Sequence, residues 1–216
     1  MKIGILFDLD GTLLDTLGDL TDATNYALRQ FGFAERSEAE IRSFVGNGAR
    51  NLIVQAMGVA ENDPQVDTVL AVYKQFYDAH WQIRTAPYPG IPEARAQLAD
   101  FPVAIVSNKP HIATSMLAEQ YFPGIYARGE QTGIPRKPAP DMLYKTMEDL
   151  GVEKCIYVGD SEVDILTAKN AGFPCISVLW GFRDKEDMPD AAIFCEKVEE
   201  LLRCIELSSI IRRGGS

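Results

Sequence analysis

The sequence predicts an α/β fold, with a doubly wound parallel sheet and a small helical domain inserted after its first strand. Short apolar runs alternate with helical stretches, which is typical of sheets whose parallel strands are joined by helices. Residues 16–84 break this alternation, because they show helical periodicity and no convincing strand. The expected strands are residues 2–7, 103–106, 155–158 and 175–179, and the expected helices are residues 91–99, 110–120, 140–150 and 162–171.

Composition narrows the classes of function. The 216 residues carry a net charge of −10, and phosphate backbones select clusters of Lys and Arg, so a nucleic-acid partner is not expected. No apolar run approaches the roughly 18 residues that span a membrane, and the apolar start is too short for a signal peptide. The four cysteines form no C-x-x-C pair, which suits reduced thiols. We therefore expect a cytoplasmic protein without a membrane partner, ending in a frayed tail at residues 210–216.

The first strand leads directly into two acidic residues. Asp8 and Asp10 are two positions apart, and Gly11 allows a sharp turn after them. Carboxylates this close repel each other unless a cation or a donor intervenes. Mg²⁺ is such a cation, since one or two carboxylates and a substrate phosphate commonly hold it. We expect Asp8, the backbone carbonyl of Asp10, and Asp160 to be its ligands, while Thr12 either caps the turn or bonds Asp8.

The insert is expected to contain several helices. Ser37 with Glu40 three residues later forms a capping box, and Asp63-Pro64 marks the start of another helix. Residues 85–90, rich in Pro and ending in Gly, follow as a stiff hinge. We therefore expect a core domain of residues 1–15 and 85–210, with residues 16–84 forming a helical cap over the site.

Two later strands end in polar residues that should meet Asp8. Ser107 and Asn108 follow the second strand, and Asp160 follows the third. Ligands of doubly wound sheets bind beyond the carboxyl ends of the strands, so these residues should converge. Ser107 and Asn108 are expected to donate to phosphoryl oxygens.

Lys137 supplies a positive charge for the same site. Prolines on both sides stiffen its loop. A lysine fixed near a phosphoryl group offsets charge on its oxygens and on the attacking carboxylate. Asp164 either caps the helix at 162–171 or supports Lys137 from outside the site.

These residues together resemble the haloacid-dehalogenase-like phosphatase superfamily. The resemblance implies a Rossmann-like core, a Mg²⁺ cofactor and hydrolysis of a small phosphate monoester. It implies that Asp8 is the nucleophile and forms a phosphoaspartate, and that Asp10 protonates the leaving oxygen and then activates water. The presence of Asp10 argues against the dehalogenase branch. The four motifs that carry the resemblance occur in order over almost the whole chain: Asp8 to Thr12, Ser107, Lys137, and Gly159-Asp160 with Asp164.

Within the superfamily, the chain is most similar to phosphoglycolate phosphatases. This likeness implies that Gly46 and Asn47, with Arg50 nearby, bind a small carboxylate of the substrate. Gly46 and Gly48 could equally serve only to end one helix and begin the next. Gly129-Glu130 departs from the Gly-Asp or Ser-Asp pair expected in this branch. The stretches that carry the likeness are residues 7–16, 45–49, 88–90 and 107–110.

Other functions remain open at this point. A sugar phosphomutase or a pyrophosphatase of the same superfamily would use the same nucleophile. A phosphoacceptor signalling domain also combines acids, a hydroxyl and a lysine on a parallel sheet, but it lacks the acid at Asp10 and the helical insert. The chain is expected to be a monomer or a homodimer.

Overall fold

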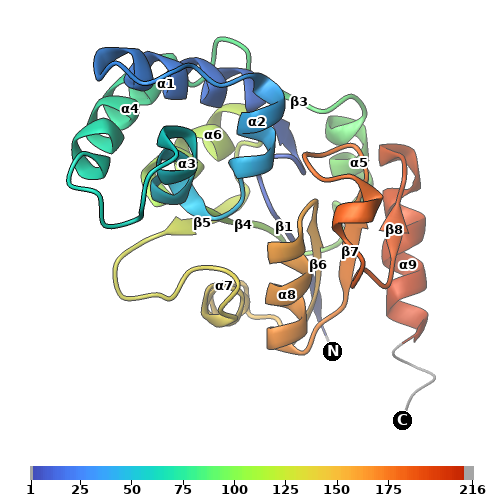
Figure 1. The fold of residues 1–216 in the computed structure, drawn as a ribbon. Coiled ribbons are helices and arrows are strands. Elements are labelled where there is room, and N and C mark those ends of the chain that lie inside the picture. Colours follow the sequence, from blue (N-terminus) through green and yellow to red (C-terminus); the bar gives the residue numbers. More distant parts are fainter. Residues whose placement is uncertain (1, 212–216) are drawn as a thin grey trace.

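The computed structural model describes residues 2–211, with side chains through residue 208, and one sheet of six parallel strands lies within them. The strand order is β5-β4-β1-β6-β7-β8, which places β1 inside the sheet (Figure 1). The predicted α/β class is confirmed, and β5 and β8 add to the four strands expected. The strands are β1 (Ile3–Phe7), β4 (Val103–Pro110), β5 (Tyr126–Glu130), β6 (Lys154–Gly159), β7 (Cys175–Val178) and β8 (Phe194–Cys195).

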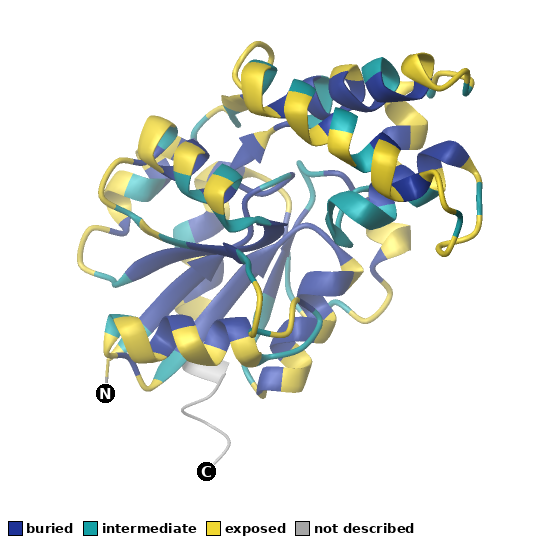
Figure 2. Ribbon diagram, turned by 90° about the vertical axis from the view of Figure 1, so that its left-hand side faces the viewer, coloured by how far each residue is buried: buried dark blue, intermediate teal, exposed yellow. Residues whose placement is uncertain are grey.

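Helices cover both faces of the sheet. Along β1, Ile5 and Phe7 pack into one hydrophobic cluster with α5, α6 and α9, whereas Leu6 packs into another with α7 and α8. Both faces of the strand are therefore apolar, which explains its uninterrupted apolar sequence. Figure 2 shows the strands buried and the covering helices exposed on their outer sides. These helices are α5 (Ile91–Gln97), α6 (His111–Tyr121), α7 (Asp141–Leu150), α8 (Glu162–Ala171) and α9 (Leu201–Ile211), with short 3₁₀ turns at Lys185–Asp187 and Val198–Glu200.

Four further helices form a layer beyond the carboxyl ends of the strands (Figure 1). They pack around a hydrophobic cluster of their own. The capping box predicted at Ser37 is present at the start of α2. The start predicted at Asp63 is early, because α4 begins at Val66 and Asp63 instead accepts a bond from Gln65 N at 2.8 Å. The helices are α1 (Leu17–Gln30), α2 (Glu38–Phe44), α3 (Gly48–Met57) and α4 (Val66–His80).

A two-stranded ribbon connects the helical layer to the sheet. β2 (Leu14–Asp15) pairs antiparallel with β3 (Ala86–Pro87), so the chain enters and leaves the layer at adjacent points. The buried carboxylate of Asp19 reinforces this point by accepting from the backbone N–H groups of Arg84 and Thr85, each at 2.9 Å. Within the segment expected as a hinge, residues 85–90, Ala86 and Pro87 are thus held in a strand paired with β2.

At the other end of the chain, α9 continues to Ile211. Residues 210–211 of the expected tail are therefore helical, and residues 212–216 lie outside the described residues. None of the helices in the described part of the chain has both the length and the apolar character to span a membrane.

Candidate active site

A cavity of about 280 Å³ lies between the carboxyl ends of the strands and the helical layer. Both parts of the molecule line it, and the three strand ends predicted to converge do so here. The core contributes Asp8, Asp10, Ser107, Asn108, Lys109 and Asp160, and the helical layer contributes Leu20, Val45, Leu52, Tyr73 and Tyr77.

Asp8 stands at the end of β1 with its carboxylate held from two sides. Its Oδ1 accepts from Leu9 N at 2.7 Å, and its Oδ2 lies 3.0 Å from Lys137 Nζ. Burial raises the pKa of Asp8 to about 7, with Asp164 and Asp10 adding to the rise and Lys137 opposing it. The carboxylate is thus oriented and lines the cavity, as a nucleophile requires.

Lys137 is the link between Asp8 and Asp164. Its Nζ lies 2.8 Å from Asp164 Oδ1 and 2.9 Å from Tyr157 Oη, and its side chain is 1% exposed. The other oxygen of Asp164 accepts from Ser161 Oγ at 2.6 Å and from Ser161 N at 3.1 Å. Asp164 therefore has both of the roles considered from sequence, since it caps α8 and holds Lys137.

Asp160 follows β6 and faces Asp8. Its Oδ2 accepts from Phe182 N at 2.7 Å, and its Oδ1 accepts from Thr12 Oγ1 at 3.3 Å. Thr12 thus bonds Asp160 rather than Asp8. Burial raises the pKa of Asp160 to about 8, and the neighbouring carboxylates of Asp164 and Asp8 add to that effect.

The donor set fits a divalent cation. Oxygen atoms of Asp8, Asp160 and Asp164 all lie within 4.8 Å of one another. Three buried carboxylates meet beside Lys137, and hard oxygen donors of this kind suit Mg²⁺. Asp164 is absent from the cavity lining, whereas Asp8 and Asp160 line the cavity. Asp8 and Asp160 are therefore the better placed ligands.

The two residues expected to bind phosphate differ in what they offer. Ser107 Oγ accepts from Lys109 N at 3.3 Å, which leaves its own O–H to donate. Asn108 Nδ2 donates to Gly46 O at 3.1 Å and to Lys137 O at 2.9 Å. Both side-chain N–H groups of Asn108 are thus engaged, and this residue ties two loops together instead of presenting an N–H to phosphate.

Asp10 is held by Lys109, a residue to which the sequence motifs assign no role. Its Oδ1 accepts from Thr16 Oγ1 at 2.7 Å, and Lys109 Nζ lies 3.0 and 3.3 Å from its two oxygens. Burial lowers the pKa of Lys109, but the Asp10 carboxylate together with Tyr77 and Tyr73 outweighs burial and holds that pKa above its usual value. The signal was a lysine in β4, directly after the polar residues Ser107 and Asn108.

The cap residues expected to bind a carboxylate are only partly brought to the cavity. Gly46 and Gly48 line it, with positive φ values of 125° and 81°. Asn47 and Arg50 are absent from the lining. Arg50 instead pairs with Asp67 and donates to the carbonyl of Glu61 within the helical layer. The geometry therefore does not bring Arg50 to the site.

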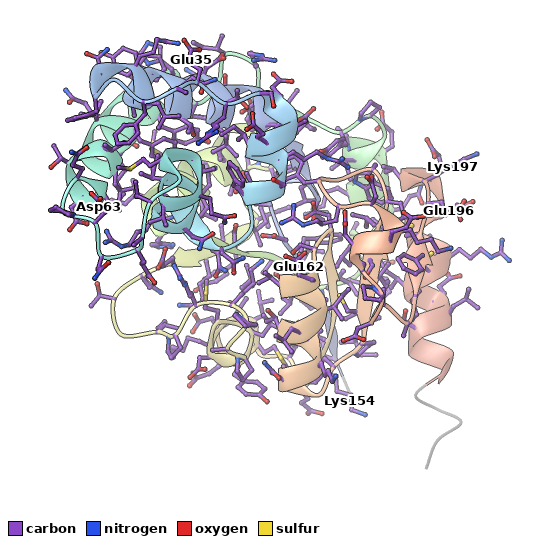
Figure 3. All side chains as sticks on the ribbon, viewed as in Figure 1. Glu35, Asp63, Lys154, Glu162, Glu196 and Lys197 are labelled. Carbon is purple, nitrogen blue, oxygen red and sulfur yellow. The ribbon has the colours of Figure 1, made fainter. Side chains whose placement is uncertain are left out.

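Arg183, also without a predicted role, joins the core to the helical layer. It pairs with Glu162 at 3.0 Å and donates to the carbonyls of Arg42 and Val45, each at 2.8 Å. Figure 3 shows Glu162 at the end of α8 that faces the helical layer, whereas Asp63 lies on the outer side of that layer. In return, Arg42 reaches into the core and donates to Gly181 O at 3.2 Å. The start of the loop after β7 is thus part of the site.

Comparison with known proteins agrees with this geometry. A family model of haloacid dehalogenase-like hydrolases matches residues 5–178. The chain belongs to this family. Phosphoglycolate phosphatases of Mesorhizobium japonicum and Rhodobacter capsulatus are 35% and 34% identical to it, covering 92% and 90% of this chain and 96% and 93% of theirs. A crystal structure from Lactobacillus delbrueckii, assigned as a phosphoglycolate phosphatase, is 38% identical, with a TM-score of 0.86 over 95% of this chain and 99% of that one.

The family predicted from the four motifs, that of the haloacid dehalogenase-like hydrolases, is thus confirmed. The likeness to the phosphoglycolate phosphatase branch is confirmed as well, and the relatives carry it over nearly their full length. An enzyme, rather than a signalling domain, is the class that these relatives support.

Proposed function

We propose that this hydrolase is a Mg²⁺-dependent phosphatase that cleaves small phosphate monoesters through a phosphoaspartate at Asp8. One observation carries the proposal. Asp8 lines the cavity while Lys137 holds its carboxylate at 3.0 Å, and Asp160 and Asp10 line the same cavity. The names of its relatives make 2-phosphoglycolate the first substrate to test.

In the first half of the reaction, a carboxylate oxygen of Asp8 attacks phosphorus and the bond from phosphorus to the ester oxygen breaks. Lys137 and the hydroxyl of Ser107 offset charge on the phosphoryl oxygens. Asp10 gives its proton to the departing oxygen, which leaves as an alcohol. Mg²⁺, held by Asp8, Asp160 and the backbone carbonyl of Asp10, would supply positive charge against the repulsion between carboxylate and phosphate.

In the second half, water attacks the phosphorus of the phosphoaspartate. Asp10 accepts a proton from that water, the acyl phosphate bond breaks, and Asp8 returns to its carboxylate with release of inorganic phosphate. Asp164 keeps Lys137 in place throughout.

We further propose that residues 16–84 act as a cap on a core formed by residues 1–15 and 85–210. The separate hydrophobic cluster of the four helices supports this division. A cap in this position excludes bulk water from the cavity during transfer. We also propose a cytoplasmic location, supported by the observation that none of the four cysteines, all of which lie in the described part of the chain, forms a disulfide.

The test is phosphate release from a panel of esters with Mg²⁺: 2-phosphoglycolate, pyrophosphate, hexose phosphates and nucleotides, with Asp8→Asn as the inactive control. Release from monoesters by the native protein alone is expected. Release from pyrophosphate only would reassign the enzyme as a pyrophosphatase, and hexose isomer without phosphate would reassign it as a mutase. Equal rates for Asp8→Asn would remove Asp8 as the nucleophile.

A further inference from the structure

We propose that Lys109 selects the substrate, and that its ammonium group binds a carboxylate in the leaving group of the ester. In binding, the substrate carboxylate takes the place that Asp10 occupies in this structure. The proposal rests on the proposed function and names its substrate class: phosphate monoesters with a carboxylate close to the ester oxygen.

Lys109 is a buried lysine that pairs with a carboxylate inside the cavity. Lys109 Nζ contacts both oxygens of Asp10, at 3.0 and 3.3 Å, and its side chain is 5% exposed. Asp10 is its one ion-pair partner in the described part of the chain. A buried ammonium without a counter-ion is strongly destabilising. Any movement of Asp10 toward the ester oxygen would therefore leave Lys109 needing another anion.

A carboxylate of the substrate can pair with Lys109 when Asp10 moves, whereas an uncharged leaving group cannot. In 2-phosphoglycolate, three bonds separate the ester oxygen from each carboxylate oxygen. Asp10 must approach the ester oxygen to protonate it, and Lys109 is already in contact with Asp10 in the same cavity. The ammonium is therefore within reach of a carboxylate at that spacing.

Aromatic side chains keep the ammonium where it is. Lys109 Nζ lies 4.6 Å from the centre of the Tyr77 ring, and Tyr73 lines the cavity beside it. An aromatic face attracts a cation without neutralising its charge. Lys109 thus stays in the cavity when its anionic partner changes.

The other cations near the cavity are less suited to this role. Lys137 lies between Asp8 and Asp164, and Arg183 is bonded to Glu162 and to carbonyls of the helical layer. Lys74 lines the cavity, but it is exposed on α4. It therefore serves as a matched control for Lys109.

The experiment compares 2-phosphoglycolate with ethyl phosphate, which has a similar size and no carboxylate. The ratio of their kcat/KM values is measured for the native protein, Lys109→Gln, Lys109→Arg and Lys74→Gln. We expect a native preference of about 100-fold for 2-phosphoglycolate, a ratio near one for Lys109→Gln, and retention of most of the preference in the other two variants. Because ethyl phosphate reports damage common to both substrates, the ratio isolates carboxylate recognition.

A binding measurement provides a second readout that does not depend on turnover. In Asp10→Asn, Lys109 has lost its carboxylate partner, so glycolate should bind this variant about 10-fold more tightly than the native protein in calorimetry. Equal affinity for the two proteins would count against the exchange of anions on Lys109.

The outcomes separate the two proposals. If the native protein hydrolyses both esters equally, or Lys109→Gln keeps the preference, the assignment of Lys109 fails while the phosphatase stands. If Lys74→Gln alone loses the preference, Lys74 takes the role instead. If the native protein releases phosphate from no ester, the proposed function fails and this assignment fails with it.

Discussion

Lys137 lies between two carboxylates, with Asp8 at 3.0 Å and Asp164 at 2.8 Å. All three side chains are almost completely excluded from solvent. Buried charges are tolerated only when they are paired, so each member of this set depends on the others. The same arrangement that orients a nucleophile is therefore a condition of stability.

We expect Lys137→Met to lower the free energy of unfolding by about 3–5 kcal/mol, because it leaves Asp8 and Asp164 buried without their cation. Denaturant unfolding near pH 8 measures the change. Lys145→Met is the control, since Lys145 is half exposed in its pair with Glu148. Lys145→Met should lower the free energy of unfolding by no more than about 0.5 kcal/mol. Similar losses for the two variants would contradict the structural role of Lys137.

The raised pKa values of Asp8 and Asp160 make the effect of Mg²⁺ on stability depend on pH. Burial holds these values at about 7 and about 8, above the ordinary value of 3.8. In acid both groups are protonated, which favours the folded state, and this contribution is lost as pH rises through about 7 and 8. A cation binds only the ionised carboxylates, so its effect must increase over the same interval.

Mg²⁺ should therefore raise Tm little near pH 5 and progressively more toward pH 8, as measured by thermal unfolding with and without the ion. Asp160→Asn should show a small, nearly constant rise across that range. A pH-independent rise in the native protein would contradict the assignment of these two carboxylates as ligands.

At the scale of secondary-structure elements, the sequence predicts the buried strands and misses the edges of the sheet. β1, β4, β6 and β7 are apolar because helices cover both of their faces. β5 is an edge strand that contains Arg128, whose Nε donates to Thr146 Oγ1 at 3.0 Å. It also contains Gly129, where a Cβ would lie 2.5 Å from the carbonyl of Lys109. Because β5 contains a charged residue and a glycine at a close backbone approach, it shows no apolar pattern from which a strand could be predicted.

The residues of the candidate site also fall into those that the sequence predicts and those that it misses. Asp8 and Asp160 were predictable because strand ends converge in a parallel sheet, and Lys137 was predictable from its proline-flanked loop and the family motifs. Lys109 and Arg183 were not, because their roles depend on Asp10 and on the carbonyls of α2. These contacts join segments about 100 residues or more apart, and no local pattern records them.

The contacts of Arg183 predict how firmly α2 is held. Replacing Arg183 with Gln removes the pair with Glu162 and weakens the bonds to the carbonyls of Arg42 and Val45. Hydrogen exchange over residues 38–48 should become about 10-fold faster, while exchange over α7 stays unchanged. Arg203→Gln, on the exposed side of α9, is the control and should leave both regions as they are. Unchanged exchange at residues 38–48 would show that Arg183 does not hold the layer.

At the scale of the whole molecule, the helical layer and the sheet line one cavity together. The helical layer has its own cluster, and the sheet has one on each face. The chain crosses between them at β2 and β3, where Asp15 pairs with Ala86. The ends of the insert are therefore already adjacent, and a short turn could join them.

We expect the core to fold after residues 16–85 are replaced by Asn-Gly, because a two-residue turn suits the antiparallel pair of β2 and β3. Circular dichroism should show cooperative thermal unfolding, and Mg²⁺ should still raise Tm. The preference for 2-phosphoglycolate over ethyl phosphate should disappear, since Tyr73 and Tyr77 are removed with the cap. Failure to unfold cooperatively would show that the sheet depends on the helical layer.

The position of β1 in the sheet also sets the order in which the chain can assemble as it is synthesised. Ile5 pairs with Val103 on one side and with Ile156 on the other. Asp8 therefore leaves the ribosome long before the strands that flank β1 and before Lys137, its ion-pair partner. The helices of residues 17–80 pack mainly against one another and can form during that interval, whereas long-range strand pairing is slow. The carboxyl end of β1 must wait, without its charge partner, until Lys137 of the 216-residue chain has been made.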